Sequence, residues 1–218
     1  MKKFLKLTTV VVSMVMALAF VSCANGNENG QLNLVGTYGL SKVEGYQKDS
    51  NGETSMTMTM PTSTSLRHYT TLKVINGETT TVTEMDYTVT KTANSYSFNW
   101  AKYNINGQAA SEDAKSQQEN QFNYDTWNRY TALFAMTYTT TADGTWSDNS
   151  NPASSGTYTV DEANSKVIMT TLIEDGKNLD KPQIMELTYS NNGKTLVFVE
   201  VESTNGNTYK QTMTLTRK

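Results

Sequence analysis

Few side chains in this chain of 218 residues are of types that could carry out covalent or metal chemistry. Cys23 is the single cysteine and His68 the single histidine. A nucleophilic triad needs a histidine beside a nucleophile and a carboxylate, and zinc needs several His or Cys ligands. The sequence around His68 offers neither arrangement. We therefore predict that the protein is not an enzyme and has no catalytic residue, no metal site and no cofactor.

The chain has 11 methionines, and three of them alternate with threonine at Met56, Met58 and Met60. Period-two spacing places three thioethers on one face of a strand, where soft sulfur ligands could bind Cu(I). Alternating Met and Thr is also the pattern of an ordinary half-buried strand. We favour the second interpretation and keep copper as the alternative.

The acidic residues give only a weak indication of a metal site. Asp143 and Asp148 flank Trp146 and could hold Ca²⁺ weakly, but the segment lacks the calcium loop of about 12 residues with its terminal Glu. We interpret both aspartates as turn residues.

The position of Cys23 gives its thiol a different chemistry. Three lysines lie among the first six residues, residues 7–21 are almost wholly apolar or small, and Ser22 precedes the cysteine. This order is typical of a secretory signal peptide, and the apolar stretch is short for a membrane span of about 20 residues. A free thiol after export would be unusual in an oxidising compartment.

A small residue followed by Cys resembles the lipobox of bacterial lipoproteins, although Phe20 stands where such motifs usually carry Leu. The resemblance implies signal cleavage between Ser22 and Cys23, with a diacylglycerol and an N-acyl chain on Cys23. Two acyl chains anchor a protein stably where one does not. Ala24 is not the Asp that marks inner-membrane retention in such lipoproteins. The resemblance therefore implies an outer-membrane anchor in the cell envelope, on either the periplasmic or the surface face.

The net charge of the chain without its signal peptide indicates which classes of partner to expect. Removing residues 1–22 takes away three lysines, which leaves 15 basic against 21 acidic residues and a net charge near −6. No block of Lys or Arg remains, so we predict no nucleic-acid partner. We expect a monomer that meets the membrane through its lipid anchor.

Turn dipeptides divide the rest of the chain into short segments. Asn-Gly and Asp-Gly tolerate positive φ and are the strongest short-range signals of a β-hairpin. The segments between them alternate with period two, and tight turns cannot join parallel strands. The dipeptides begin at Asn51, Asn76, Asn106, Asp143, Asp175, Asn192 and Asn205.

Many consecutive antiparallel strands must close or stack, because open edges invite aggregation. We predict an all-β domain over residues 34–218, joined to the anchor by an Asn/Gly-rich tether at 23–33. Its fold is expected to be an antiparallel up-and-down β-barrel of about 8–10 strands, with a β-sandwich as the alternative. A change of parity near Trp100 predicts a bulge. Leu196–Val201 is apolar on both faces, so we expect it to be covered on both sides.

One segment does not alternate. Residues 108–121 predict one short helix with Ser111 as its N-cap. The helix could extend to Tyr130, because Trp127 and Tyr130 recur at helical spacing. We expect it on the barrel wall or across the barrel mouth.

Two short motifs resemble a known family. Gly36-Thr37-Tyr38 is similar to the opening Gly-x-Trp strand of lipocalins, with Tyr38 in place of Trp, and Thr214–Arg217 is similar to their closing strand. The resemblance implies a calycin-type barrel whose end is closed by Tyr38 and Arg217, the guanidinium lying over the ring. It also implies binding of a small apolar or amphipathic ligand. The lining residues expected on this basis are Met56, Met58, Met60, Trp100, Tyr103 and Met136, with Met169, Met185 and Met213 as further methionines of the wall.

A cluster of aromatic residues supports an alternative function. Planar rings with polar tips suit either a wet-rimmed pocket or a flat glycan platform, and they also suit packing of the helix onto the barrel. The alternative is a cell-surface interaction protein that contacts a host protein or glycan. The cluster consists of Tyr96, Phe98, Trp100, Tyr103, Phe122, Tyr124, Trp127 and Tyr130.

Overall fold

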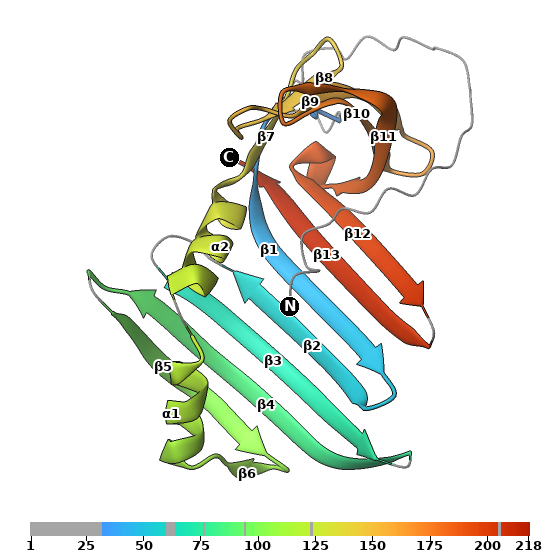
Figure 1. Cartoon of the computed structure of the whole chain (residues 1–218). Helices are drawn as coiled ribbons and strands as arrows, with labels where there is room; N and C mark the ends of the chain where they lie inside the picture. Colours follow the sequence, from blue (N-terminus) through green and yellow to red (C-terminus); the bar gives the residue numbers. More distant parts are fainter. Residues whose placement is uncertain (1–31, 60–63, 76, 94, 123, 205) are drawn as a thin grey trace.

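The computed structural model describes residues 32–218 except for 60–63, 76, 94, 123 and 205 (Figure 1). This part of the chain folds into antiparallel strands joined mostly by tight turns, with two short α-helices inserted midway. No helix among the described residues is long and apolar enough to cross a bilayer. Cys23, Ser22 and Met60 lie outside the described residues.

The elements follow one another along the chain in three groups. Before the helices come β1 (Gly36–Asp49), β2 (Gly52–Thr59), β3 (Thr64–Ile75), β4 (Glu78–Lys91), β5 (Tyr96–Ile105) and β6 (Gln108–Ala109). The helices are α1 (Glu112–Asn120) and α2 (Tyr124–Ala135). After them come β7 (Thr137–Thr140), β8 (Thr145–Asp148), β9 (Ser155–Asp161), β10 (Lys166–Glu174), β11 (Lys177–Ser190), a 3₁₀ turn (Asn191–Gly193), β12 (Thr195–Thr204) and β13 (Asn207–Arg217).

Eight of these strands close into a barrel. Their order around it is β1, β7, β8, β9, β10, β11, β12, β13 and back to β1. The start of β1, Gly36–Gly39, pairs with β7, whereas Val43–Asp49 pairs with β2. Strand β13 follows β1 on its other edge, and the register shifts between Leu40 and Lys42 as the pair leaves the barrel.

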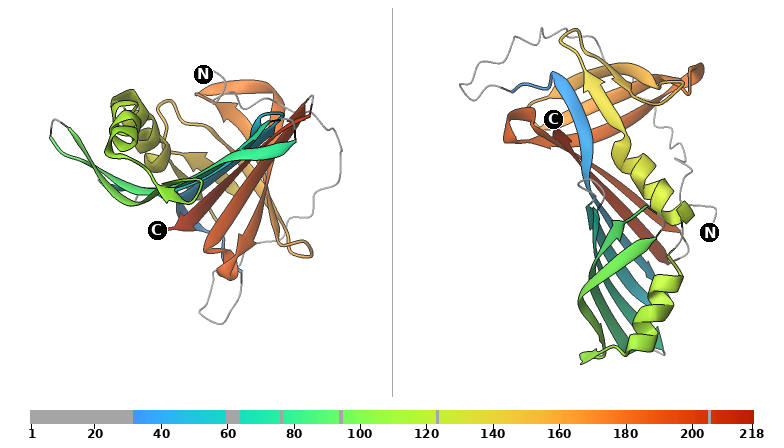
Figure 2. Two further views of the ribbon diagram at one scale, coloured as in Figure 1. Left: turned by 90° about the horizontal axis from the view of Figure 1, so that it is seen from below. Right: turned by 90° about the vertical axis from the view of Figure 1, so that its left-hand side faces the viewer.

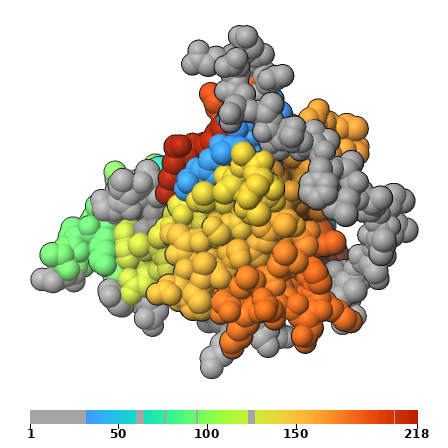
Figure 3. Space-filling model, turned by 90° about the horizontal axis from the view of Figure 1, so that it is seen from above, coloured from blue at the N-terminus to red at the C-terminus, as the bar shows by residue number. Residues whose placement is uncertain are grey.

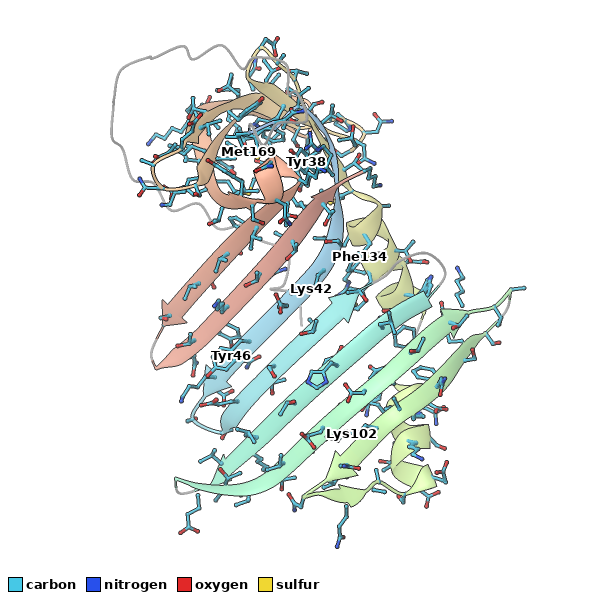
Figure 4. The ribbon with its side chains drawn as sticks, turned by 180° about the vertical axis from the view of Figure 1, so that it is seen from behind. Tyr38, Lys42, Tyr46, Lys102, Phe134 and Met169 are labelled. Atoms are coloured by element: carbon cyan, nitrogen blue, oxygen red, sulfur yellow. The ribbon has the colours of Figure 1, made fainter. Side chains whose placement is uncertain are left out.

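The strands that leave the barrel build a second, open sheet, which we call the sheet extension. It consists of β2–β6 together with Val43–Asp49 of β1, Asn207–Met213 of β13 and Val199–Thr204 of β12 (Figure 1). Strand β12 pairs with β11 only from Thr195 to Phe198, and beyond this point the two strands separate. Tyr38 and Met169 therefore lie in the barrel, whereas Tyr46 lies out along the extension of the same strand β1 (Figure 4).

The predicted all-β fold and its antiparallel barrel are confirmed, and the sandwich alternative is wrong. Two of the predicted turns have positive φ at both residues: Asn106 (φ 52°) and Gly107 (φ 77°) join β5 to β6, and Asp175 (φ 49°) and Gly176 (φ 72°) join β10 to β11. The bulge near Trp100 is present, because Tyr87 pairs with Trp100 while Asp86 pairs with Lys102. Two features differ from the prediction. Five strands lie outside the barrel, and two helices replace the single one.

The helices cover one face of the sheet extension, which we call the helix-side face (Figure 2). Ser111 is the N-cap of α1 as predicted, since its hydroxyl accepts a hydrogen bond from the Ala114 amide at 3.2 Å. Helix α2 places Trp127, Tyr130 and Phe134 at helical spacing on its sheet-facing side. That apolar side explains why α2 packs on the sheet.

Two apolar cores result. The barrel core contains Tyr38, Val167, Met169, Leu187 and Leu196, each at most 2% exposed. The second core lies between the helices and β3–β5 and is built around Tyr87, Val89 and Trp127. Phe134 of α2 packs against both cores and lies between them in space (Figure 4).

One expectation about burial is wrong. Leu196 is 2% exposed, but Val199 and Val201 are 45% and 58% exposed. The physical reason is the separation of β12 from β11. Leu196 belongs to the barrel, whereas the two valines lie on the extension, where the face opposite the helices has no covering layer among the described residues.

Candidate functional site

An apolar pocket opens at the mouth of the barrel, beneath α2. Four of its lining residues are methionines, whose flexible thioether side chains adapt readily to an apolar partner. Leu133 of α2 contributes to the lining from outside the barrel. The pocket is lined by Leu40, Leu133, Met136, Tyr138, Met169, Met185, Leu187, Phe198, Met213 and Leu215.

The pocket is small as it stands. Its free volume is about 30 Å³, which is room for about one water molecule, whereas ligand pockets usually reach about 300–1,000 Å³. Inward-facing side chains fill the barrel instead, Met169 and Leu187 being 2% and 1% exposed. Viewed from above, the barrel segments form a continuous surface (Figure 3).

Tyr38 and Arg217 lie opposite each other as cross-strand partners on β1 and β13. The fully buried Tyr38 hydroxyl donates to the carbonyl oxygens of Leu34 and Gly193, at 3.0 and 2.6 Å. The Arg217 guanidinium donates to the carbonyl of Val35 at 3.0 Å. Burial raises the pKa of Tyr38, and the positive charge of Arg217 opposes that shift. Both side chains thus tie the segment before β1 to the barrel through backbone carbonyls.

Six residues were predicted to line a ligand site, and the structure separates the five of them that it describes. Met136 lines the pocket at the barrel mouth. Met58, fully buried, and Met56 lie on β2 in the sheet extension. Trp100 and Tyr103 stack on each other on β5 with ring centroids 5.2 Å apart. Met60 lies outside the described residues.

The further methionines of the predicted wall do come together. Met169, Met185 and Met213 line the same pocket as Met136. The sequence reasoning missed Leu133. One signal in the sequence could have indicated it. An apolar residue recurs at helical spacing along α2, at Trp127, Tyr130 and then Leu133 or Phe134.

Six members of the aromatic cluster belong to the second core and do not form a flat exposed platform: Tyr96, Phe98, Trp100, Phe122, Trp127 and Tyr130. The side chain of Tyr124 lies outside the part of the chain that the structure describes. The Tyr87 and Trp100 rings lie 4.6 Å apart, and Tyr96 and Trp127 lie 5.5 Å apart across the interface between sheet and helix. Trp127 is 3% exposed. The Trp100 indole donates to the Glu119 carboxylate of α1 at 2.7 Å, which fixes the helix over the sheet.

Arg67 is an unexpected member of this core. It is 5% exposed, and its guanidinium carbon lies 4.8 Å from the Phe122 ring centre and 4.7 Å from that of Tyr130. Its Nε donates to the Ser65 hydroxyl at 3.1 Å, while Nη2 has no hydrogen-bond partner. No described carboxylate forms an ion pair with it. Two aromatic faces therefore take the place of a counter-ion.

His68 lies on the opposite, open face of the extension and is half exposed. Its Nδ1 contacts the Asp86 carboxylate, and its Nε2 lies 3.4 Å from the Thr70 hydroxyl. The pair borders an open depression of about 260 Å³ that also involves Thr57 and Thr88. These residues belong to interior strands with neighbours on both edges. Their backbone amides are engaged in the ladder, so the polar groups on this face come from side chains.

The acidic turn residues accept hydrogen bonds within their loops. Asp143 accepts from the Thr145 hydroxyl at 2.9 Å, and hydrogen bonds from Thr141 and Thr145 lower its pKa. Asp148 accepts from the backbone amides of Ser150 and Ser154. Within the described part of the chain, no group of three or more His, Cys, Asp or Glu side chains is placed to hold a metal ion.

No protein-family model matches this chain, and a comparison with curated proteins gives no match.

Proposed function

We propose that this protein is a lipid-anchored, lipocalin-like binding protein of the bacterial cell envelope. Its ligand is a small apolar or amphipathic molecule, held at the methionine-lined mouth of the barrel. The observation that carries the proposal is the convergence of Met136, Met169, Met185 and Met213 on one apolar pocket beneath α2.

The free volume of the pocket defines how binding must work. About 30 Å³ does not accept an alkyl chain or a ring, so the ligand has to displace side chains. Methionine has three rotatable bonds and repacks at low cost, unlike the branched residues of a rigid core. Leu133 reaches the pocket from α2, so a small outward movement of this helix would enlarge the site.

The proposed anchor rests on the resemblance of the segment before Cys23 to a lipobox. Attachment of a diacylglycerol to the Cys23 thiol, cleavage before Cys23 and acylation of the new amino terminus would place the protein on the membrane, with residues 24–33 as the tether. We propose an outer-membrane location, a monomer, and no metal, cofactor or nucleic-acid partner. The anchor is tested with Cys23→Ser in cells supplied with an alkyne-labelled fatty acid. We expect labelling and membrane association of the native protein and loss of both in the variant.

Binding is tested on the lipid-free domain with an environment-sensitive fluorescent fatty acid. We expect Met185→Gln, which adds a polar group of similar length inside the pocket, to weaken binding at least tenfold. Leu172→Gln is the matched control, because Leu172 is 41% exposed and does not line the pocket. Equal affinities for the native protein and both variants would place any binding elsewhere. Solvent extraction followed by mass spectrometry then identifies the molecule that co-purifies.

A further inference from the structure

The outer edge of β12 in the sheet extension is open. Strand β12 pairs with β13 along its whole length, but its pairing with β11 stops at Phe198. From Val199 to Thr204, no described strand lies on the other side, and β12 forms the border of the extension (Figure 1). Six residues of extended backbone span about 20 Å.

The hairpin register shows which backbone groups face outward. Thr204 pairs with Asn207 across a two-residue connection, and the pair that closes such a hairpin exchanges hydrogen bonds. Hydrogen-bonded pairs alternate along the ladder, so Glu202 and Glu200 also direct their amides and carbonyls toward β13. The amides and carbonyls of Val199, Val201 and Ser203 therefore point away from the sheet, toward a vacant strand position.

The side chains along this edge alternate in character. Val199 and Val201 are 45% and 58% exposed and lie on the open face beside Thr212 and Lys210. Glu200 and Glu202 lie on the other face, beside Gln211 and Tyr209. Neither carboxylate forms an ion pair with a described basic residue.

We propose that this edge binds a partner protein by strand addition, and that the partner segment alternates apolar residues with Lys or Arg. The outward backbone groups would continue the ladder, as in other β-augmentation complexes. The apolar side chains of the partner would pack beside Val199 and Val201. Its basic side chains would meet Glu200 and Glu202, with Tyr209, 38% exposed, beside them.

Charge distinguishes this partner from a second copy of the chain. Symmetric antiparallel pairing of two β12 edges would bring glutamates of both copies onto one face of a shared ladder. Like charges directly opposite each other destabilise a strand pair. The two glutamates thus disfavour self-association at an edge whose valines and free backbone groups would otherwise promote it.

The test uses the lipid-free domain and a fluorescent, end-blocked peptide of three Lys-Val repeats, with anisotropy as the readout. A Glu-Val peptide of the same length and a Lys-Val peptide with alternate backbone N-methylation serve as matched probes. We expect saturable binding of the Lys-Val peptide and at least tenfold weaker binding of both others, because one lacks the charge and the other the hydrogen bonds.

Three variants locate the site. The double variant Glu200→Lys, Glu202→Lys should no longer bind the Lys-Val peptide and should bind the Glu-Val peptide instead. Its control, Asp113→Lys with Glu162→Lys, changes net charge equally at exposed positions away from β12 and should bind as the native domain does. Val201→Pro removes an outward amide without removing a bond to β13, so it should weaken binding while the melting temperature stays close to native.

The proposal is overturned by any of three results: no saturable binding of the Lys-Val peptide at millimolar concentration, equal binding of the charge-swapped peptide, or insensitivity to both edge variants. A concentration-dependent dimer that Val201→Pro abolishes would also overturn it, since a second copy would then be the occupant. The lining of the barrel-mouth pocket does not include these edge residues. The outcome is therefore independent of apolar ligand binding.

Discussion

Replacement of Arg67 tests how the helices are held on the sheet. The guanidinium stacks between Phe122 and Tyr130, which contributes about 1–2 kcal/mol per ring in a desolvated site. The charge-assisted hydrogen bond to Ser65 adds about 1.5–3 kcal/mol. Against these, burial of a charge without a counter-ion costs several kcal/mol, and the unpartnered Nη2 adds about 1–3 kcal/mol.

These opposing contributions are of similar size, so their sum lies near zero. We therefore expect Arg67→Met, which keeps an unbranched apolar side chain in the same space, to change the free energy of unfolding by less than about 1 kcal/mol. Arg67→Ala leaves a void between the two rings and should cost about 2–4 kcal/mol.

Urea unfolding followed by tryptophan fluorescence measures both variants against the native domain, with equal slopes as the condition for comparison. The reasoning is refuted if Arg67→Met loses as much stability as Arg67→Ala. That result would mean that the charge itself stabilises the fold, because its interactions with the two rings and Ser65 outweigh the cost of burial.

Four further experiments test the packing described above. Phe134→Ala should cost about 2–3 kcal/mol in urea unfolding, since Phe134 joins the two cores, and a loss below 0.5 kcal/mol would contradict that role. Trp100→Phe removes the hydrogen bond to Glu119 and should cost about 1 kcal/mol, with no further loss when Glu119→Gln is added. Ser111→Ala should cost about 1 kcal/mol through loss of the α1 cap, while Ser111→Asp should retain native stability. Burial raises the pKa of Tyr87 above its usual value of 10.0. The buried, protonated hydroxyl therefore contributes fully to the free energy of unfolding below pH 10, and this contribution is lost as the pH rises further. The free energy of unfolding, measured from pH 8 to 11, should therefore decline less steeply for Tyr87→Phe than for the native domain.

Local sequence signals account for most individual elements. Dipeptides such as Asp175-Gly176 adopt the positive φ values that tight hairpins require, and Ser111 caps α1. The change of parity near Trp100 correctly predicted the bulge in β5. Each of these signals involves only residues that are close together in the chain, so it can be recognised without knowledge of the tertiary structure.

The placement of strands relative to the barrel depends on distant partners. Strand β1 changes neighbour from β7 to β2 within one continuous run. The parity of its buried residues changes between Leu40 and Val43, but a change of parity predicts a bulge and does not identify a new neighbouring strand. Met56 and Met58 therefore look like barrel lining although they belong to the extension. The same cause explains Val199 and Val201, whose sequence resembles a strand covered on both faces.

Arg67 shows a second limit of sequence reasoning. A basic residue next to His68 suggests a polar surface, and the rings that bury it arrive more than 50 residues later in the chain. Among the pocket residues, the methionines were expected from the lipocalin resemblance. The contribution of Leu133 required the position of α2 over the barrel mouth.

Methionine methyl resonances give the most direct test of the proposed function. The lipid-free domain is labelled with ¹³C at its methionine methyl groups and titrated with a twelve-carbon fatty acid below its micelle concentration. The proposal predicts saturable shifts for Met136, Met169, Met185 and Met213, which line the pocket, and small shifts for Met56 on the extension. Unchanged spectra, or shifts centred on Met56, would contradict ligand binding at the barrel mouth.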